Sequence, residues 1–461
     1  SGFLMVTASH NPIGHNGLKF GFQDGRVAGG ATAQRVSDAF VSTLLEEERF
    51  LQVQKAWDRG VDLGLEDVYT GAGTYKEEAE QAYRGKVIEC ILRRPLETGG
   101  GALLSNLEEG LRQERFGVVI DYNGSARAAS IDRSLLEGLG AKVRAIHDTP
   151  GEIAHAIVPE GEGLAECKAE LERAYAEDKS FRIGYTADND GDRGNLVFID
   201  PESGEAEQLH AQEVFALATV AELAWDELIQ DATGQRESAP PAVVVNGPTS
   251  NRIETVAAAW GAEVFRAEVG EANVIDRALE LSDHRVVIMA EGSNGGNITP
   301  PSLVRDPLST VGAIIKLART VAFAGWFNKR GAVVPKGRNL LSLVRALPGY
   351  RTTGAYEERA ILRIRTQDHN TLKERYEARF PDAFQKKERW LKEKLRVQGY
   401  RIVNYEGTQT VLGPGNRSGD GRGGFKVELL DPEGEVRGFL WMRGSKTEPA
   451  FRIMADAATQ E

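Results

Sequence analysis

The most constraining feature of this sequence is a strand, helix, strand pattern that occurs twice. In its first occurrence, the apolar run 116–120 is followed by a helical stretch over 126–139 and by a second strand over 141–146. Strands that alternate with helices of this length form layered domains around a parallel sheet. The sequence therefore predicts an α/β fold.

The second occurrence repeats the first in outline and in some of its letters. It begins with the strand 243–245, continues through a helix that reaches Trp260, and ends in a strand at Val264. The repeated letters are Asn123-Gly124 and Gly140-Ala141 in the first copy, and Asn246-Gly247 and Gly261-Ala262 in the second. The repetition indicates two domains built on one plan, although a glycine after a helix is also a common end signal.

Length and charge limit the classes of protein that this chain can belong to. Its 461 residues predict about three domains, at roughly 150 residues per domain. Its 56 Lys and Arg against 68 Asp and Glu give a net charge of −12, which argues against a nucleic-acid-binding face. No apolar run is long enough to cross a bilayer, so we expect no membrane partner. Its two cysteines, Cys90 and Cys167, do not form a disulfide framework, and we expect a cytoplasmic protein.

The chain opens with the apolar run 1–6, which leads directly into a polar loop at Thr7. The run contains no basic residue, so it differs from a signal peptide, and it predicts a short buried strand. Because a domain rarely begins with its own central strand, we expect part of the first domain to precede this segment.

Four polar loops carry residues suited to chemistry, and the first follows this strand. Residues 7–12 (TASHNP), with Lys19 close behind, offer the Ser9 hydroxyl as a nucleophile or phosphate carrier beside a cation. A capping serine before an Asn-Pro turn has the same letters, so this loop alone is not specific.

The second loop, residues 188–193 (DNDGDR), follows the predicted strand 181–185 and contains Asp188, Asp190 and Asp192. Alternate residues of an extended segment point the same way, so these carboxylates can converge on one hard cation. Oxygen ligands favour Mg²⁺ or Ca²⁺ over Zn²⁺. A calcium-binding EF-hand is excluded because it needs Gly at position six and Glu at position twelve, where this loop has Arg and Ile. The remaining alternative is a surface loop with three mutually repelling acids.

The third and fourth loops carry groups that bind sugars and phosphates. Residues 291–296 (EGSNGG) present the Glu291 carboxylate and the Ser293 hydroxyl on a glycine-rich turn, where they can hydrogen-bond neighbouring sugar hydroxyls. Residues 443–449 (RGSKTEP) supply a guanidinium and two hydroxyls, a donor set for a phosphate dianion. Taken singly, a tight polar turn and a hairpin loop are the alternatives for these segments.

In this order, the four loops closely resemble those of the α-D-phosphohexomutase superfamily, the phosphoglucomutases and phosphomannomutases. TASHNP is similar to the family's phosphoserine loop, DNDGDR to its metal loop, EGSNGG to its sugar-binding loop and RGSKTEP to its phosphate-binding loop. The resemblance implies four α/β domains around a central cleft, each supplying one loop, with the first incomplete at its N-terminus. The implied domains are residues 1–75, 76–205, 206–345 and 346–461.

The resemblance also assigns roles to single residues. Ser9 would carry the phosphoryl group that is exchanged with the substrate, and Lys19 and Arg193 would stabilise charge during its transfer. Mg²⁺ would be held by Ser9, Asp188, Asp190 and Asp192. The sugar hydroxyls would be bound by Glu291 and Ser293, and the phosphate that does not react by Arg443, Ser445 and Thr447.

The implied activity is an intramolecular phosphotransfer between α-D-hexose 1-phosphate and 6-phosphate. Phospho-Ser9 would give its phosphoryl group to the hexose phosphate, and the hexose 1,6-bisphosphate, which is also the activator, would turn round and return its other phosphate. The alternatives are a sugar-phosphate phosphatase and a catalytically retired sugar-phosphate-binding protein. The residues leave the oligomeric state open.

Two departures from the family pattern concern the sugar. Many members have a His two residues after the serine of the sugar loop, where this chain has Gly295, and this favours the phosphoglucomutase-like pattern. The segment 268–271 resembles another family turn near the sugar, but Glu271 or Ala272 stands where a basic residue or His is often found. Glucose is therefore favoured, with mannose as the second candidate.

Overall fold

The computed structural model describes residues 2–458 except for short gaps. The gaps are residues 8, 10, 12–13, 61–65, 114, 235–236, 294, 321, 367, 414, 416–422 and 445–449. For residues 31, 60, 66–69, 233 and 337 only the backbone is described.

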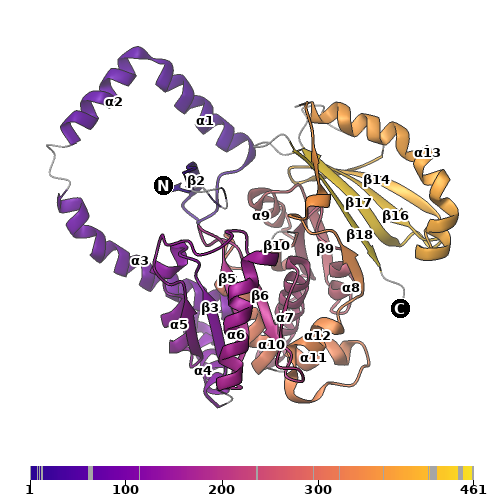
Figure 1. The fold of residues 1–461 in the computed structure, drawn as a ribbon, viewed down its shortest axis with the longest axis horizontal. Helices are drawn as coiled ribbons and strands as arrows, with labels where there is room; N and C mark the ends of the chain where they lie inside the picture. The colour runs from indigo at the N-terminus through magenta and orange to yellow at the C-terminus, as the bar shows by residue number, and fades with distance from the viewer. Residues whose placement is uncertain are drawn as a thin grey trace.

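Two sheets with parallel centres form the middle of the molecule (Figure 1). The first has the order β4-β3-β5-β6-β7, and β3 runs parallel to both β4 and β5. Its strands are β3 (Gly117–Asp121), β4 (Lys142–Ile146), β5 (Phe181–Ala187), β6 (Gly194–Ile199) and β7 (Ala206–Gln208). The predicted α/β fold is confirmed, and the first strand, helix, strand unit has its predicted strands.

The second sheet has the order β11-β10-β8-β9, and β8 runs parallel to both β9 and β10. Its strands are β8 (Pro241–Asn246), β9 (Glu263–Ala267), β10 (Arg285–Glu291) and β11 (Gly296–Ile298). The two sheets thus repeat one parallel plan, as the repeated letters predict. Ligands bind at the carboxyl ends of the strands in such sheets, which is where the acidic loops lie.

One large apolar core joins these two sheets. It contains Val118 and Ile120 of β3 and Val243 and Val245 of β8, together with the buried faces of the helices between them. The central helix α7 (Ala211–Thr233) contacts α10, α8, β10 and β6. The helices around these sheets are α3 (Glu66–Leu92), α4 (Gly100–Gln113), α5 (Asp132–Gly138), α6 (Ala165–Glu177), α8 (Arg252–Ala258), α9 (Glu271–Leu279), α10 (Pro307–Arg319), α11 (Ala322–Lys329) and α12 (Leu340–Arg345).

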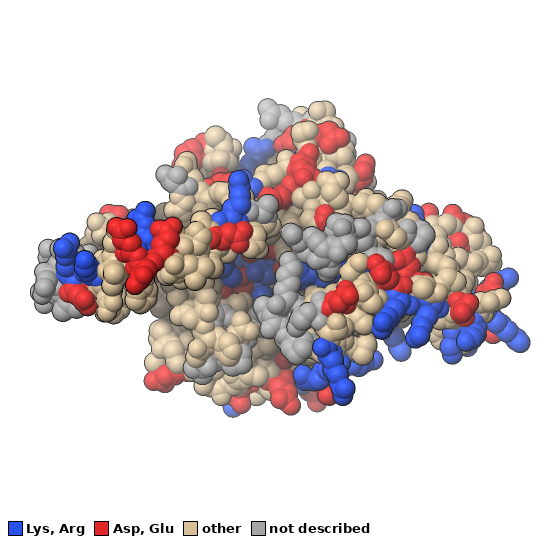
Figure 2. Space-filling view, turned by 90° about the horizontal axis from the view of Figure 1, so that it is seen from above, with Lys and Arg blue, Asp and Glu red and all other residues tan. Residues whose placement is uncertain are grey.

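The last part of the chain forms an antiparallel sheet covered by the long helix α13 (His369–Leu395). The strand order is β12-β18-β17-β16-β14-β15, with β13 also paired to β18. The strands are β12 (Tyr350–Thr352), β13 (Ile361–Arg363), β14 (Gly399–Glu406), β15 (Gln409–Leu412), β16 (Gly424–Leu430), β17 (Val436–Gly444) and β18 (Ala450–Ala458). Lys and Arg side chains gather at the end of the molecule formed by this unit (Figure 2).

The first part of the chain differs from its prediction. The strand β1 (Gly2–Val6) pairs only with β2 (Leu18–Phe22), and Leu4 and Val6 remain 57% and 61% exposed. The predicted buried strand is therefore wrong for the described structure, because a two-stranded sheet with no layer against it cannot bury its side chains. The helices α1 (Gly30–Leu45) and α2 (Glu47–Gly60) form an arch that leads away from this sheet and returns through α3 (Figure 1).

The predicted helix over 126–139 is also broken. Residues 126–129 form a 3-10 turn, Ser130 is extended, and α5 starts only at Asp132. The side chain of Arg127 donates from Nε to Asp132 Oδ1 at 2.9 Å, which ties the two pieces together across the break. The local pattern is helical, but this buried ion pair decides the geometry.

Two features of the described residues concern the expected surroundings of the protein. Cys90 and Cys167 are both buried free thiols, and burial raises the pKa of each to about 12. Among the described helices, none is by itself long and apolar enough to span a membrane, whereas the bent pair α10 and α11, at 74° to one another, passes the length and composition test together.

Candidate active site

The predicted metal loop is a closed turn between β5 and β6. The amide of Asp188 donates to the carbonyl of Arg193 at 3.0 Å, and the amide of Gly191 donates to the carbonyl of Asp188 at 3.1 Å. Gly191 has φ +73°, and a Cβ on it would lie 2.4 Å from Arg127 Cδ, so only glycine fits. The three carboxylates therefore converge through a tight turn, and the expected extended segment is wrong.

The carboxylates of Asp188, Asp190 and Asp192 bring ligand oxygens within 4.8 Å of one another. Each has one oxygen that is buried and has no hydrogen-bond partner among the described residues: Asp188 Oδ2, Asp190 Oδ1 and Asp192 Oδ1. Buried acceptors are normally satisfied, so three unsatisfied oxygens at one place fit a hard cation such as Mg²⁺.

Burial and neighbouring charges shift the pKa values of Asp188 and Asp192 in opposite directions. Burial, and then the charge of Asp192, raise the pKa of Asp188 to about 7. The pKa of Asp192 is lowered, because the charges of Arg305, Arg193 and Lys19 outweigh its burial. Acids whose pKa values are driven apart in this way are typical of functional sites.

The loop that contains Ser9 lies directly against the metal loop. Thr7 Oγ1 accepts a hydrogen bond from the amide of Ser9 at 2.8 Å and donates one to Asp190 Oδ2 at 2.7 Å. Ser9 is half-buried in a turn with φ +52°, a conformation that is strained for a residue other than glycine. The hydroxyl that the sequence predicts to react is therefore carried on a strained turn tied to the predicted metal ligands.

Lys19 is brought to the same place by strand pairing. Its partner across the β1–β2 ribbon is Met5, and its Nζ lies 3.2 Å from Asp190 Oδ2 and 3.5 Å from Asp192 Oδ2. Its ammonium thus binds the oxygens of Asp190 and Asp192 that are not free for a metal. The structure brings Lys19, Ser9 and the metal loop together.

Arg193 ends the metal loop and extends toward the C-terminal part of the chain. Its Nε lies 3.8 Å from Asp188 Oδ2 and 3.6 Å from Asp192 Oδ1, and its Nη1 donates to the hydroxyl of Tyr356 at 2.8 Å. Burial and Arg305 lower the pKa of Arg193, but Tyr356 and the carboxylates raise it more strongly. The net effect is a raised pKa, so Arg193 stays charged. A fixed, buried guanidinium beside the acids can stabilise charge on a transferring phosphoryl group.

The predicted sugar loop is also in place, at the end of β10. Asn246 Nδ2 donates to Glu291 Oε1 at 3.3 Å and to Ser293 Oγ at 3.1 Å, and the amide of Gly270 donates to Glu291 Oε1 at 2.7 Å. Glu291 and Ser293 are therefore neighbours, both buried and oriented by protein donors. The carbonyl of Gly295 accepts from the amide of Gly194, so this loop packs on the end of the metal loop.

Arg305, which the sequence motifs do not include, joins the two loops. Its Nη2 donates to Asp192 Oδ2 at 2.6 Å and lies 3.4 Å from Glu271 Oε2, and its Nη1 lies 3.1 Å from Glu291 Oε2. Burial lowers its pKa, but these three carboxylates raise it more strongly, so it is a permanent buried cation. Glu271, which with Ala272 is one of two candidates for the position where the resemblance leads to a basic residue or His, binds Arg305 through its carboxylate.

The fourth predicted loop is described only at its start. Arg443 lies near the end of β17, and its Nη2 is 3.4 Å from Glu268 Oε1. Glu268 also accepts from the amides of Gly407 at 2.9 Å and Gly423 at 3.2 Å. Ser445 and Thr447 lie outside the described residues, so their predicted role stays a prediction.

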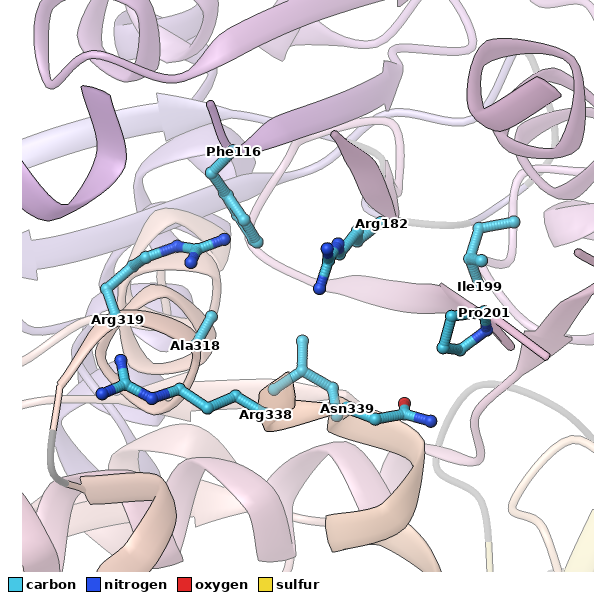
Figure 3. Close-up of a pocket in the computed structure, with 9 residues that line it drawn as sticks. Phe116, Arg182, Ile199, Pro201, Ala318, Arg319, Arg338 and Asn339 are labelled. Atoms are coloured by element: carbon cyan, nitrogen blue, oxygen red, sulfur yellow. The ribbon is translucent and has the colours of Figure 1, made fainter. Parts of the chain in front are cut away.

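A separate small pocket lies at the opposite edge of the first sheet (Figure 3). Phe116 and Arg182, at the amino ends of β3 and β5, face it together with Arg319 and Arg338. None of the predicted site residues lines it. Basic side chains are also visible in the recess at the centre of the face shown in Figure 2.

Tyr356, Arg305 and Thr7 are the functional candidates that sequence reasoning missed. Thr7 stands inside a motif, two residues before Ser9, and its hydroxyl could have been included. Arg305 has only a weak signal, since it directly precedes the Asp306-Pro307 helix start, and Tyr356 has none. Both reach the site from segments distant in sequence.

The sequence is similar to those of known sugar-phosphate mutases. The sequence model described as "Phosphoglucomutase/phosphomannomutase, alpha/beta/alpha domain I" matches residues 1–46. A phosphoglucomutase/phosphomannomutase of Thermococcus kodakarensis is 26% identical over 463 residues, an alignment that covers 100% of this chain and 75% of the relative. A phosphoglucosamine mutase of Alkaliphilus oremlandii is 23% identical over 310 residues, which are 65% of this chain and 57% of the relative.

The fold has relatives among solved structures. A phosphoglucomutase/phosphomannomutase family protein of Burkholderia thailandensis superposes with a TM-score of 0.52 at 15% identity, and the match covers 99% of this chain and 72% of that protein. The resemblance that the four loops predict is thereby confirmed: the chain is similar in sequence to phosphoglucomutases and phosphomannomutases, and in fold to a solved protein of that kind.

Proposed function

We propose that the chain is an intramolecular phosphotransferase that interconverts α-D-hexose 1-phosphate and 6-phosphate through a phosphoserine at Ser9. The observation that carries the proposal is the group of three unsatisfied carboxylate oxygens on Asp188, Asp190 and Asp192, beside the turn that holds Ser9. Phosphoryl transfer depends on positioning and on charge stabilisation more than on covalent chemistry at other groups. The site offers both.

The proposed reaction uses Ser9 first as donor and then as acceptor. The bond between Ser9 Oγ and phosphorus breaks as the free hydroxyl of a hexose monophosphate attacks, and hexose 1,6-bisphosphate forms. After the bisphosphate turns round, Ser9 Oγ attacks its other phosphate and the isomeric monophosphate leaves. Mg²⁺ bound by the three aspartates would neutralise charge on the phosphoryl oxygens.

The basic residues have distinct parts in this proposal. Lys19 and Arg193 flank the acidic loop and stabilise charge that develops during transfer. Arg443, now beside Glu268, binds the phosphate that does not react, and Ser445 and Thr447 complete that pocket. Glu291 and Ser293 bind sugar hydroxyls, since a carboxylate accepts more hydrogen bonds than the protein donors here supply.

Glucose is the proposed sugar, with mannose second. Gly295 has φ +79°, and a Cβ there would lie 3.2 Å from the carbonyl oxygen of Gly194. A His side chain at this position would be strained and crowded, so the departure from the family pattern is built into the loop backbone. The matches to both glucose/mannose and glucosamine mutases make all three sugar phosphates proper substrates to test.

Phosphorus NMR of the full chain with Mg²⁺, glucose 1-phosphate and a trace of glucose 1,6-bisphosphate tests the proposal. We expect the signal of glucose 6-phosphate to grow without release of orthophosphate. Repeating the experiment with mannose 1-phosphate and glucosamine 1-phosphate compares the rates of turnover of the three sugars. Ser9→Ala should abolish turnover, whereas Ser203→Ala, at an exposed turn, should leave it unchanged. Release of orthophosphate would indicate a phosphatase instead, and binding without turnover a retired enzyme.

A further inference from the structure

A second cluster of metal-binding side chains lies at the end of β3, outside the predicted site. We call Asp121, His147 and His155 the Asp121 cluster. Their ligand atoms lie within 4.8 Å of one another: Asp121 Oδ1 is 2.9 Å from His147 Nδ1, and Asp121 Oδ2 is 2.9 Å from His155 Nε2. Asp121 is fully buried, so its charge needs a compensating cation.

The hydrogen positions on the His155 ring indicate that a cation is needed between this ring and Asp121. Its Nδ1 lies 3.0 Å from the carbonyl oxygen of Ala156, which can only accept, so Nδ1 carries a hydrogen. In the neutral ring Nε2 is then a lone pair, and it faces the Asp121 carboxylate at 2.9 Å. Two acceptors at this distance repel each other unless a cation is bound between them.

The histidine orientation matches that of metal ligands. A ligating histidine usually donates its other ring N–H to a backbone carbonyl or carboxylate, as His155 does to Ala156. The carboxylate has its own outer contact, since the amide of Asn123 donates to Asp121 Oδ1 at 3.1 Å.

The backbone around the cluster is strained in a way that presents these side chains. His147 has φ +49° directly after β4, and Asn123 has φ +45° two residues after the end of β3. Asn123 Oδ1 accepts from the amides of Ala154 and His155 at 2.9 and 3.0 Å, which fixes the segment that carries His155. Strain that surrounding contacts maintain is characteristic of functional positions.

We propose that Asp121, His147 and His155 form a second metal site, selective for Zn²⁺ or a transition ion with the same ligand preference. Two imidazoles and one carboxylate are a zinc ligand set with one open position, whereas the all-oxygen group at Asp188 suits Mg²⁺. The ion replaces the proton between His155 Nε2 and Asp121, and binding releases that proton to solvent.

The cluster has a direct connection to the catalytic loop. The turn after Asn123 continues to Ala126, whose amide donates to the carbonyl of Asn189 at 2.9 Å. Asn189 lies between Asp188 and Asp190, so a metal that holds residues 121–126 rigid also supports the metal loop. The second site is therefore expected to have a structural role, and its loss should lower thermal stability as well as activity.

Isothermal titration of the full, chelator-treated chain with Zn²⁺ in excess Mg²⁺ tests the proposal. We expect one zinc equivalent, and loss of at least about 100-fold in affinity in His155→Ala and in His147→Ala, since even outer-shell changes cost 10–100-fold. The matched control is His284→Ala, because His284 also contacts a carboxylate, that of Asp283 at 2.8 Å, but belongs to no metal-binding cluster among the described residues. Equal zinc affinity in wild type and His155→Ala would overturn the proposal.

The unmutated protein gives a second test that does not depend on the variants folding. Co²⁺ added in excess Mg²⁺ should produce the intense visible absorption of a four-coordinate site with nitrogen ligands, and Zn²⁺ should remove it. A weak spectrum of an all-oxygen, six-coordinate ion would contradict the proposal. Nitrogen NMR that shows His155 still protonated on both ring atoms in excess Zn²⁺ would do so too, and would identify the cation as a proton.

Discussion

Asp188 is the residue at which burial and function conflict most directly. Its carboxyl is almost fully buried beside two other acids, and one of its oxygens has no hydrogen-bond partner among the described residues. Burial and the charge of Asp192 raise its pKa to about 7. The native protein thus binds a proton there more tightly than the unfolded chain does, so stability falls as the pH rises from 3.8 toward 7.

The substitution Asp188→Asn should therefore change stability and activity in opposite directions. Without metal at pH 8, we expect the variant to be more stable than wild type by roughly 1–3 kcal/mol, because the unfavourable charge is gone. With Mg²⁺ the wild type should gain stability and turn over, and the variant should do neither. Urea unfolding with chelator and with Mg²⁺ measures this, with the exposed Asp38→Asn as control. A variant that is less stable without metal would contradict the account.

Arg305 provides the opposite case, a buried cation that neutralises three acids. The substitution Arg305→Met leaves three carboxylates without their shared partner, those of Asp192, Glu271 and Glu291. Loss of one member of a buried ion cluster costs about 3–5 kcal/mol, which should appear as a lower unfolding midpoint in urea. Adding Glu271→Gln should restore part of the loss. If the single variant is as stable as wild type, Arg305 does not hold the two loops together.

At the scale of elements, the strands follow the sequence most closely. The predicted strands 181–185 and 243–245 lie within observed strands, and 116–120 overlaps β3 with a shift of one residue, because continuous apolar runs between turns suit a buried parallel sheet. The predicted helix over 126–139 is interrupted, since the pairing of Arg127 with Asp132 is not encoded in its periodicity. The strand at the chain start is exposed because burial depends on a neighbouring layer, which local sequence does not specify.

The site shows the same division between local and long-range information. The loops around Ser9, Asp188 and Glu291 are contiguous motifs, and their residues do meet in space. Arg305 and Tyr356 contact these residues from segments more than a hundred residues away from the metal loop. The spacing of residues in the sequence does not predict these buried contacts. The motifs predict which chemistry is present, whereas the residues that connect the motifs can be identified only from the folded structure.

The element β16 contains a buried lysine whose removal should stabilise the protein. Lys426 is fully buried, and its Nζ has no hydrogen-bond partner among the described residues. This Nζ lies 4.0 Å from the centre of the Phe439 ring. Burial, and then Arg266, lower its pKa to about 7 from 10.5. The unfolded chain therefore binds more protons between these values, and wild-type stability rises with pH across that range.

Lys426→Met should remove this pH dependence. We expect the variant to be more stable than wild type by roughly 1–3 kcal/mol at pH 7, with the difference shrinking toward pH 10. Unfolding in urea at several pH values checks the slope, and Lys386→Met on the exposed face of α13 is the control. A difference that stays constant with pH would show that the pKa of Lys426 is not lowered in the native state, and would contradict the account.

At the scale of the whole molecule, one buried carboxylate makes several of the contacts that fix the C-terminal sheet to the rest. Asp456 of β18 accepts from Ser250 Oγ and the amide of Asn251, both at 2.8 Å, and from Thr352 Oγ1 at 2.5 Å. These contacts connect the C-terminal unit to the start of α8. Arg443 is carried by the same unit, so the contacts also set where the predicted phosphate loop lies.

Asp456→Ala should loosen this connection. Loss of a buried acceptor leaves its donors unsatisfied, and we expect a cost of about 1–3 kcal/mol or more. Unfolding should then separate into two transitions in urea, one for the C-terminal unit, and the KM for hexose phosphate should rise more than kcat falls. A single transition at the wild-type midpoint would show that other contacts hold the two units together.

The central claim is that Ser9 exchanges a phosphoryl group with the sugar. Mass spectrometry of peptides from the full chain, incubated with Mg²⁺ and glucose 1,6-bisphosphate, tests it most directly. The account predicts one phosphoryl group on the peptide that contains Ser9, absent in Ser9→Ala and removed when excess glucose 1-phosphate is added. Sustained isomerisation with Ser9 unmodified, or unimpaired in Ser9→Ala, would contradict the account.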